Sequence, residues 1–165
     1  MMHQKERQTM QNSPWEFIQT LQTLSIASSN HDHSPHISYA PFIEYDKAFY
    51  ICISGMAAHT KNLLQHDTAS IMISEDESQS TNLFAKKRVS FDVEVLPIAR
   101  DSEAFEKAMV HFFDKFSDQA NIYAQMADFQ LFRLTPKSGR AVFGFGKAYD
   151  FKNGEFSDKP MGMMR

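Results

Sequence analysis

The chain has 165 residues and a formal net charge of −3, so it lacks the basic field expected of a nucleic-acid-binding protein. Its hydrophobic residues, 42% of the total, are too many for a disordered chain and enough for one folded core. A single cysteine, Cys52, excludes an internal disulfide and a thiolate zinc site built from one chain, and we expect one domain over residues 1–165.

The two ends of the chain are polar. The first residues, MMHQKERQTMQNSPWEF, carry charges and amides where a signal peptide would need an apolar run, and no later stretch is apolar for long enough to cross a bilayer. We therefore expect a cytoplasmic protein that does not enter membranes. The segments 1–12 and 151–165 are polar or contain glycine, and we expect both to be mobile tails.

The first half of the chain predicts one helix and a meander of three strands. Ser13 and Pro14 are typical of an N-cap and a first helical position, and Glu16 is placed to close a capping box. From about Thr23 the spacing becomes strand-like (LSIASS), and the polar turn NHDHSP leads into the strand HISYAPFIEY. A short turn then leads into FYICIS, where we expect Cys52 to be a buried core residue.

The second half predicts helices that fill the gaps between strands. Residues 55–67 have helical spacing, and the apolar stretch TASIMIS follows as a strand. After a charged loop, AKKRVSFDVEVLPIAR is a long strand with three valines and Phe91 on one face. Apolar residues at helical spacing predict a helix that begins at residues 101–103 and a second piece over 118–127. The chain closes with the strands FQLFRLTP and RAVFGFGKAYDF, joined at Pro136–Gly139.

The order of these elements predicts the fold class. About six strands mostly follow one another in sequence, which favours an antiparallel barrel with helices packed at its side over a doubly wound parallel sheet. The 15 phenylalanines supply flat apolar surface, which suits either a β-rich core or a planar ligand. The predicted class is therefore mainly β with flanking helices (α+β).

Three histidines, His31, His33 and His36, have an HxHxxH spacing that suggests a metal site, because imidazoles on a turn can converge. They lie in a hydrophilic turn, where solvated histidines are common, and no carboxylate or thiol pattern completes the set. We therefore interpret them as solvated side chains and predict no metal site.

Four short segments stand out by their order along the chain: SYAPF (38–42), AAHTKNL (57–63), LFAKKRVSFD (83–92) and ADFQLFRLTPKSGRAVFGFGKAY (127–149). Together they resemble the HugZ/HutZ-type haem-utilisation proteins of the pyridoxamine 5'-phosphate oxidase-like, FMN-binding split-barrel superfamily. The resemblance implies a six-stranded antiparallel Greek-key split β-barrel that forms a homodimer. It also implies a groove between the subunits for a small planar anionic ligand.

The flavin-binding branch of this superfamily places FMN at the dimer interface, with its phosphate held by Ser, Arg and Lys groups near a short helix. A phosphate needs positive charge and N–H donors, so this arrangement is chemically sensible. The resemblance assigns the cofactor-binding role to Ser38, Tyr39, Ser54, His59, Lys61 and Arg88. Ala58 departs from the pattern, because the flavin enzymes and some haem-type relatives carry arginine there. A surface or capping role for His59, and an ordinary charged strand end at Arg88, stay open as alternatives.

The haem-binding branch places haem at the same interface, with an axial histidine from the C-terminal tail and an acidic residue that tunes it through a hydrogen bond. Asp128 matches the acidic position, so the resemblance makes it the catalytic residue; an ordinary helix-end carboxylate is the alternative. No histidine follows His111 in the sequence, and the axial ligand therefore stays open.

These assignments lead to a functional prediction with two alternatives. We predict a haem-binding protein of haem and iron utilisation, with oxygen-dependent haem degradation at the dimer interface as its candidate activity. The alternatives are an FMN-binding oxidoreductase of the pyridoxamine-phosphate-oxidase-like kind and a non-enzymatic haem carrier. The cofactor is thus predicted to be haem or FMN.

Overall fold

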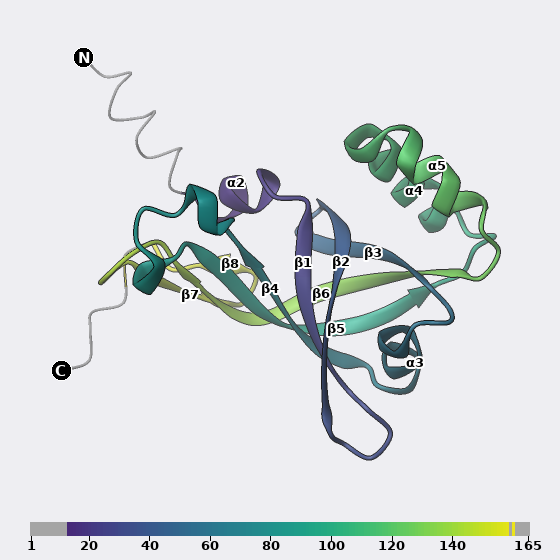
Figure 1. Ribbon diagram of the computed structural model, residues 1–165, viewed down its shortest axis with the longest axis horizontal. Coiled ribbons are helices and arrows are strands. Elements are labelled where there is room, and N and C mark those ends of the chain that lie inside the picture. Colours follow the sequence, from purple (N-terminus) through teal and green to yellow (C-terminus); the bar gives the residue numbers. More distant parts are fainter. Residues whose placement is uncertain (1–12, 159, 161–165) are drawn as a thin grey trace.

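The computed structural model describes residues 13–158 and residue 160. Its main feature is an antiparallel sheet with the strand order β3-β2-β1-β4-β5-β6-β7-β8 (Figure 1). Because β3 also pairs with β6, the first six strands close into a barrel. The strands are β1 (Thr23–Ser29), β2 (Pro35–Tyr45), β3 (Ala48–Ser54), β4 (Thr68–Ser74), β5 (Arg88–Ile98), β6 (Phe129–Val142), β7 (Ala148–Lys152) and β8 (Glu155–Phe156). The predicted α+β class and its six-stranded antiparallel barrel are confirmed.

Helices pack around this barrel. They are α2 (Pro14–Gln19), α3 (Ala58–Gln65), α4 (Glu103–Phe116) and α5 (Asp118–Gln125), with the 3-10 turns η1 (Glu77–Gln79) and η2 (Leu83–Ala85). The helices α4 and α5 lie side by side, with α4 against β2, whereas α3 packs against β1 and β2 (Figure 1). None of the helices in the described residues is both long and apolar enough to span a membrane.

The barrel interior follows from alternation along the strands. On β5, Val89, Phe91, Val93 and Val95 are buried, whereas the residues between them are exposed, as a side-chain period of two predicts. The indole ring of Trp15 on α2 stacks on the Phe91 ring with 5.8 Å between ring centres. This contact anchors α2 to the core of the barrel.

A second apolar cluster joins α4 to the outer face of the sheet. Phe105, Ala108 and Phe112 of α4 are buried in the same cluster as Ile43 on β2. The predicted start of the helix is confirmed, because the Ser102 side chain accepts a hydrogen bond from the Phe105 N–H at 3.2 Å. The helix pair α4–α5 therefore covers the outer face beside β3 and leads the chain back to β6.

The expectation of a mobile tail from residue 151 is wrong for residues 151–156, because β7 and β8 pair there. Phe151 is only 2% exposed, and its ring centre lies 5.0 Å from that of Phe156. Asn153 and Gly154, with φ values of 53° and 82°, form the turn between the two strands. Two apolar rings thus hold a mostly polar stretch on the barrel. The remaining expected tail residues, 1–12, 159 and 161–165, lie outside the described part of the chain.

The expected turn at Pro136–Gly139 is also wrong, because β6 runs through these residues without a break and the turn into β7 lies at 143–147. The register between β5 and β6 shifts beside Asp92, which leaves Lys137 as the extra residue of a β-bulge. A bulge accommodates proline, which has no N–H to donate to the ladder. Pro136 therefore marks a bulge in a long strand and not the end of one.

Two local predictions also need correction. The helix α2 begins at Pro14 as predicted, but the Ser13 side chain makes no capping hydrogen bond, so the capping box is not formed. Cys52 is only partly buried and lies beside α4 and α5, outside the barrel interior. Burial nevertheless raises the pKa of the Cys52 thiol to about 11, so little thiolate is present at neutral pH.

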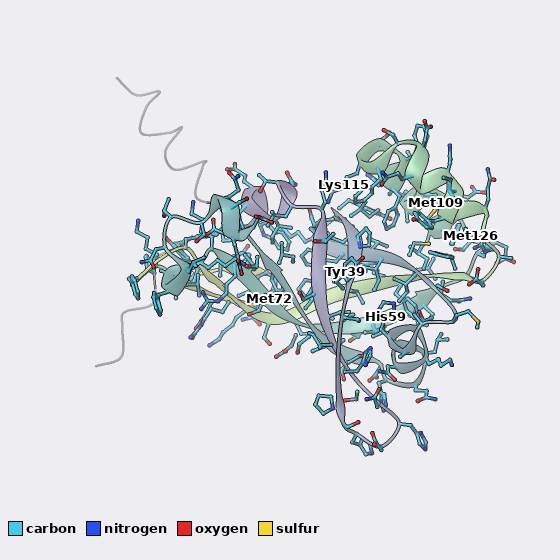
Figure 2. The ribbon with its side chains drawn as sticks, in the orientation of Figure 1. Tyr39, His59, Met72, Met109, Lys115 and Met126 are labelled. Atoms are coloured by element: carbon cyan, nitrogen blue, oxygen red, sulfur yellow. The ribbon has the colours of Figure 1, made fainter. Side chains whose placement is uncertain are left out.

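Lys115 on α4 ties this helix to two neighbouring segments, and we expect its replacement to destabilise the protein (Figure 2). Its ammonium donates hydrogen bonds of 2.8 Å to the carbonyl oxygens of Leu21 and Phe42. Burial lowers the pKa of Lys115 to about 8, so the ammonium is still charged at pH 7. In urea denaturation at that pH, Lys115→Met should lose about 2 kcal/mol of unfolding free energy, because both carbonyls lose their donor.

The matched control for this prediction is Lys107→Met, at an exposed position on the same helix. It should change the unfolding free energy by less than about 0.5 kcal/mol. Equal denaturation midpoints for Lys115→Met and the wild type would show that the two carbonyls do not depend on the ammonium.

Candidate functional site

Four of the residues predicted for the site lie around the start of α3. The Ser54 hydroxyl donates a hydrogen bond to Oδ2 of Asp128 at 3.0 Å, although the two residues are 74 positions apart in the sequence. The Ser38 hydroxyl oxygen lies 2.7 Å from Nδ1 of His59, the second residue of α3 (Figure 2). These residues therefore form two hydrogen-bonded pairs beside the same helix end.

The chain between β3 and α3 is held against the residue that precedes β6. The Gly55 N–H donates to the Asp128 carbonyl oxygen at 2.8 Å, and a Cβ atom on Gly55 would lie 2.6 Å from that oxygen. The buried Thr60 hydroxyl donates to the Ser54 carbonyl oxygen at 2.5 Å. Sequence reasoning missed both Gly55 and Thr60. The AAHTKNL segment contains Thr60, but a glycine required by a close approach leaves no signal in a single sequence.

The position of α3 itself depends on a polar anchor. Asn62 is only 5% exposed and donates through Nδ2 to the Ser28 hydroxyl at 3.0 Å and to Oδ1 of Asn30 at 3.1 Å. These two partners lie at the end of β1, and the neighbouring Leu63 is buried in the barrel core. The helix α3 is therefore fixed to the β1–β2 hairpin, and this also fixes the position of His59.

His59 is partly buried, and this burial is the larger cause of a lowered pKa. The neighbouring His36 is the smaller cause, because a second positive charge there would repel the first. The imidazole of His59 is therefore neutral at neutral pH. Since Nδ1 contacts Ser38, Nε2 is the ring nitrogen left for a ligand.

The lowered pKa of His59 predicts a loss of stability in acid. The unfolded chain protonates His59 near its ordinary pKa of 6.5, whereas the folded protein takes up this proton only at a lower pH. The stability linked to neutral His59 is thus present above about pH 6.5 and is lost as the pH falls through the folded value. In urea denaturation between pH 7.5 and pH 5, His59→Gln should lose less stability on acidification than the wild type.

The control for this pH dependence is His31→Gln, because His31 is exposed in the β1–β2 turn. This variant should keep the slope of stability against pH that the wild type has. If all three proteins lost stability in parallel on acidification, the stated role of His59 would be wrong.

The other predicted site residues have different positions. Tyr39 is 68% exposed on the outer face of β2, and Lys61 is exposed on α3. Arg88 pairs with Val142 at the far end of the 14-residue strand β6, whereas Asp128 directly precedes the start of that strand. At about 3.3 Å per residue the two ends of β6 are roughly 40 Å apart along the strand. Within one chain the structure therefore does not bring Arg88 to this site.

An apolar surface covers the outward face of β2, β1 and β4. Ile37 is 71% exposed, Tyr39 68% and Met72 40%. The strand register sets Ile37 opposite Ala27, and sets both Tyr39 and Met72 opposite Ser25, so these side chains share one face (Figure 2). We call this surface the outer patch; it consists of Ile37, Tyr39, Met72, Ala27 and Ser25. Exposed apolar side chains gathered on one face in this way are typical of an interaction site.

No group of three or more His, Cys, Asp or Glu side chains that could hold a metal ion occurs among residues 13–158 and 160. The histidines of the HxHxxH spacing separate in space. The ring of His33 lies near that of His66, with 6.2 Å between ring centres, whereas His36 lies near His59. His31 is exposed in the turn.

The closed antiparallel barrel, with one helix anchored to its β1–β2 hairpin and a helix pair on its outer face, is that of a split-barrel protein. A model of the pyridoxamine 5'-phosphate oxidase family matches residues 15–143. Because this match covers more than half of the chain, the protein belongs to that family.

Two curated proteins resemble the chain. It is 36% identical over 143 residues to the heme oxygenase HutZ of Vibrio cholerae, a match that covers 87% of this chain and 81% of HutZ. It is 28% identical over 160 residues to the chloroplastic non-canonical heme oxygenase HOZ of Arabidopsis thaliana, covering 92% of this chain and 47% of HOZ. The resemblance to HutZ-type proteins is therefore confirmed.

Solved structures support the same relationship. The crystal structure of Vibrio cholerae HutZ, described as a heme storage protein, has a TM-score of 0.75 and 35% identity, and the match covers 79% of this chain and 93% of HutZ. Campylobacter jejuni ChuZ has a TM-score of 0.80 and 30% identity, with 89% of this chain and 60% of ChuZ covered. Both matches include most of the chain.

Proposed function

We propose that this protein binds haem beside the start of α3 and degrades it with oxygen, at a site that a second copy of the chain completes. Two relatives described as heme oxygenases, one of them 36% identical, support this proposal. The observation that carries it is the hydrogen-bonded pair of Ser54 and Asp128 beside α3.

This pair favours haem over FMN. In the flavin-binding branch the phosphate occupies the region that Ser54 and His59 border, and it requires positive charge and hydrogen-bond donors. Here the Ser54 hydroxyl donates to the Asp128 carboxylate instead, which brings a negative charge to that region. Ala58 supplies no cation for a phosphate where flavin enzymes and some haem-type relatives carry arginine. A phosphate would therefore meet repulsion, whereas a carboxylate beside a haem suits the acidic role expected of Asp128.

The side chains around α3 are of the chemical types that bind haem. His59 offers the Nε2 nitrogen, and the Lys61 ammonium on the same helix is suited to a propionate. Met56, 82% exposed between β3 and α3, offers apolar surface for the ring. When bound, haem supplies the redox-active iron and the conjugated ring at which oxygen reacts.

The protein's own part in this reaction centres on Asp128. Its Oδ2 atom accepts the hydrogen bond from Ser54, while the side chain as a whole is exposed. Oδ1 is then the atom that accepts or holds a proton next to a bound ligand. The apolar surface around the ligand excludes water and so strengthens this interaction.

The proposed site needs a second chain because its residues are open to solvent in one chain. Ser54 and His59 are only partly buried, and Asp128 is exposed. The outer patch, which includes Tyr39, exposes three large apolar side chains on one face of the sheet. We propose that the outer patches of two copies pack together and form the haem groove at their edge.

The dimer proposal predicts that a charge in the outer patch separates the subunits. Met72→Arg places a guanidinium in the proposed interface, so the variant should sediment as a monomer and lose at least about tenfold in haem affinity. The matched control is Val110→Arg on α4, which is 60% exposed outside the patch and should stay dimeric. A monomeric wild type, or a dimeric Met72→Arg protein, would show that the outer patch is not the interface.

The haem proposal is tested by absorption spectra of the purified protein titrated with haemin and, separately, with FMN. The expected result is a saturable Soret band with haemin at micromolar or lower concentration, which then decays with release of iron when a reductant and air are supplied. A stable Soret band under those conditions would indicate a haem carrier. Saturable binding of FMN without binding of haemin would indicate a flavoprotein, and binding of neither ligand would refute both cofactor assignments.

A further inference from the structure

We propose that Ser54 and Gly55 form a latch that fixes the position of the Asp128 side chain. In this role Ser54 is a positioning residue and not a group that binds the cofactor directly. The inference rests on the proposed function, in which the Asp128 carboxylate acts beside the bound haem. The latch consists of contacts from the end of β3 to the residue before β6.

Asp128 lies in the turn between α5 and β6 and is exposed, so its carboxylate would sample several rotamers without further contacts. The latch binds it at two points. The Ser54 hydroxyl donates to Oδ2 of the side chain at 3.0 Å, and the Gly55 N–H donates to the main-chain carbonyl oxygen at 2.8 Å. With the backbone and the carboxylate both bound, the direction in which Oδ1 points is set.

Gly55 is required by the closeness of this approach. A Cβ atom at this position would lie 2.6 Å from the Asp128 carbonyl oxygen and 3.7 Å from the carbonyl carbon. The nearest atom belongs to the backbone, so it cannot turn aside as a flexible side chain would. Any side chain at position 55 must therefore push Asp128 away from the end of β3.

The hydroxyl of Ser54 is itself oriented. Its oxygen accepts a hydrogen bond from the Met56 N–H at 3.2 Å, which leaves the hydroxyl proton for the Asp128 carboxylate. The Ser54 carbonyl oxygen accepts from the buried Thr60 hydroxyl on α3. Thr60 directly follows His59 on α3. The latch therefore links the Asp128 carboxylate to the end of α3 beside which the haem is proposed to bind.

A second serine–aspartate pair in the chain provides a matched control. The Ser78 hydroxyl donates to Oδ1 of Asp76 at 2.6 Å in the exposed turn η1, which belongs neither to the site nor to the outer patch. Ser78→Ala removes the same kind of hydrogen bond as Ser54→Ala. A difference between these two variants is therefore due to where the bond lies.

The experiment compares haem affinity, the rate of Soret decay and the ¹³C signal of the Asp128 carboxyl group in the wild type, Ser54→Ala, Ser54→Thr and Ser78→Ala. Ser54→Ala should slow Soret decay by roughly 10- to 100-fold at unchanged haem affinity and shift the carboxyl signal. Ser54→Thr keeps the hydroxyl and should restore both readouts. Ser78→Ala should match the wild type. Gly55→Ala should shift the carboxyl signal as Ser54→Ala does.

The carboxyl signal is measured without haem, so the latch is tested even if the proposed function fails. A shift in Ser54→Ala, recovered in Ser54→Thr, would support the latch in a protein that does not degrade haem. An unchanged signal in Ser54→Ala would overturn the latch, whatever the activity. In a protein that does degrade haem, equal decay rates for Ser54→Ala and Ser78→Ala would overturn the positioning role of Ser54.

Discussion

Replacing Asp128 by asparagine should lower the rate of haem degradation by about 100-fold while haem still binds. Asparagine has nearly the same shape and keeps an oxygen that accepts the hydrogen bond from Ser54, so the turn before β6 should not change. It carries no negative charge, however, and it cannot accept a proton as a carboxylate does. The variant therefore separates the chemistry of the carboxylate from its place in the fold.

The measurement is the decay of the Soret band in one turnover, with haem affinity determined by titration of the same preparation. Asp114→Asn is the control, because Asp114 is exposed on α4 and should leave both values unchanged. Equal decay rates for Asp128→Asn and the wild type would show that the Asp128 carboxylate takes no part in the reaction. A loss of haem affinity equal to the loss of rate would make it a binding residue and not a catalytic one.

Replacing Phe91 by alanine should lower the unfolding free energy by about 4 kcal/mol. Its side chain is 1% exposed, and its ring centre lies 5.4 Å from that of Phe49 and 5.2 Å from that of Phe151. The rings of Trp15 and Phe156 complete its surroundings, each with 5.8 Å between ring centres. The cavity left by alanine would therefore loosen α2, β5 and the strand pair β7–β8 together.

Urea denaturation monitored by the fluorescence of the single tryptophan checks this prediction, because Trp15 stacks on Phe91. Phe91→Leu, which keeps most of the volume, should lose less than Phe91→Ala and gives a measurable protein if the alanine variant does not fold. The control Phe84→Ala removes a ring that is 92% exposed and should change the unfolding free energy by less than about 0.5 kcal/mol. A similar effect of both alanine variants would contradict the assignment of Phe91 to the core.

Much of the barrel could be predicted because strands and helices leave periodic patterns in the sequence. The alternation from Val89 to Val95 indicated β5 and the face that it buries, and Ser102 indicated the start of α4. Errors arose where a residue type has more than one structural use. Pro136 is typical of a turn, but a proline also fits a bulge. The polar stretch that follows Phe151 suggests a tail, although Phe156 within it pairs with Phe151.

The site residues were predictable as a set but not as an arrangement. Ser54, His59 and Asp128 were all named from the sequence, yet nothing in the sequence indicated that Ser54 and Asp128 form a pair. Arg88 was grouped with them because a phosphate or propionate attracts cations. The strand register, which only the folded chain possesses, sets Arg88 at the opposite end of β6.

By itself the amino-acid sequence determined the composition of the core, the identity of most strands and helices, and the family to which the chain belongs. These properties depend on side-chain periodicity and on short motifs, which involve neighbours only a few positions apart. The tertiary structure alone decided the Ser54–Asp128 contact, the requirement for Gly55 and the existence of the outer patch. Each of these depends on how strands distant in sequence align, and the free energy that selects a register comes from burial of the whole barrel and not from any one segment.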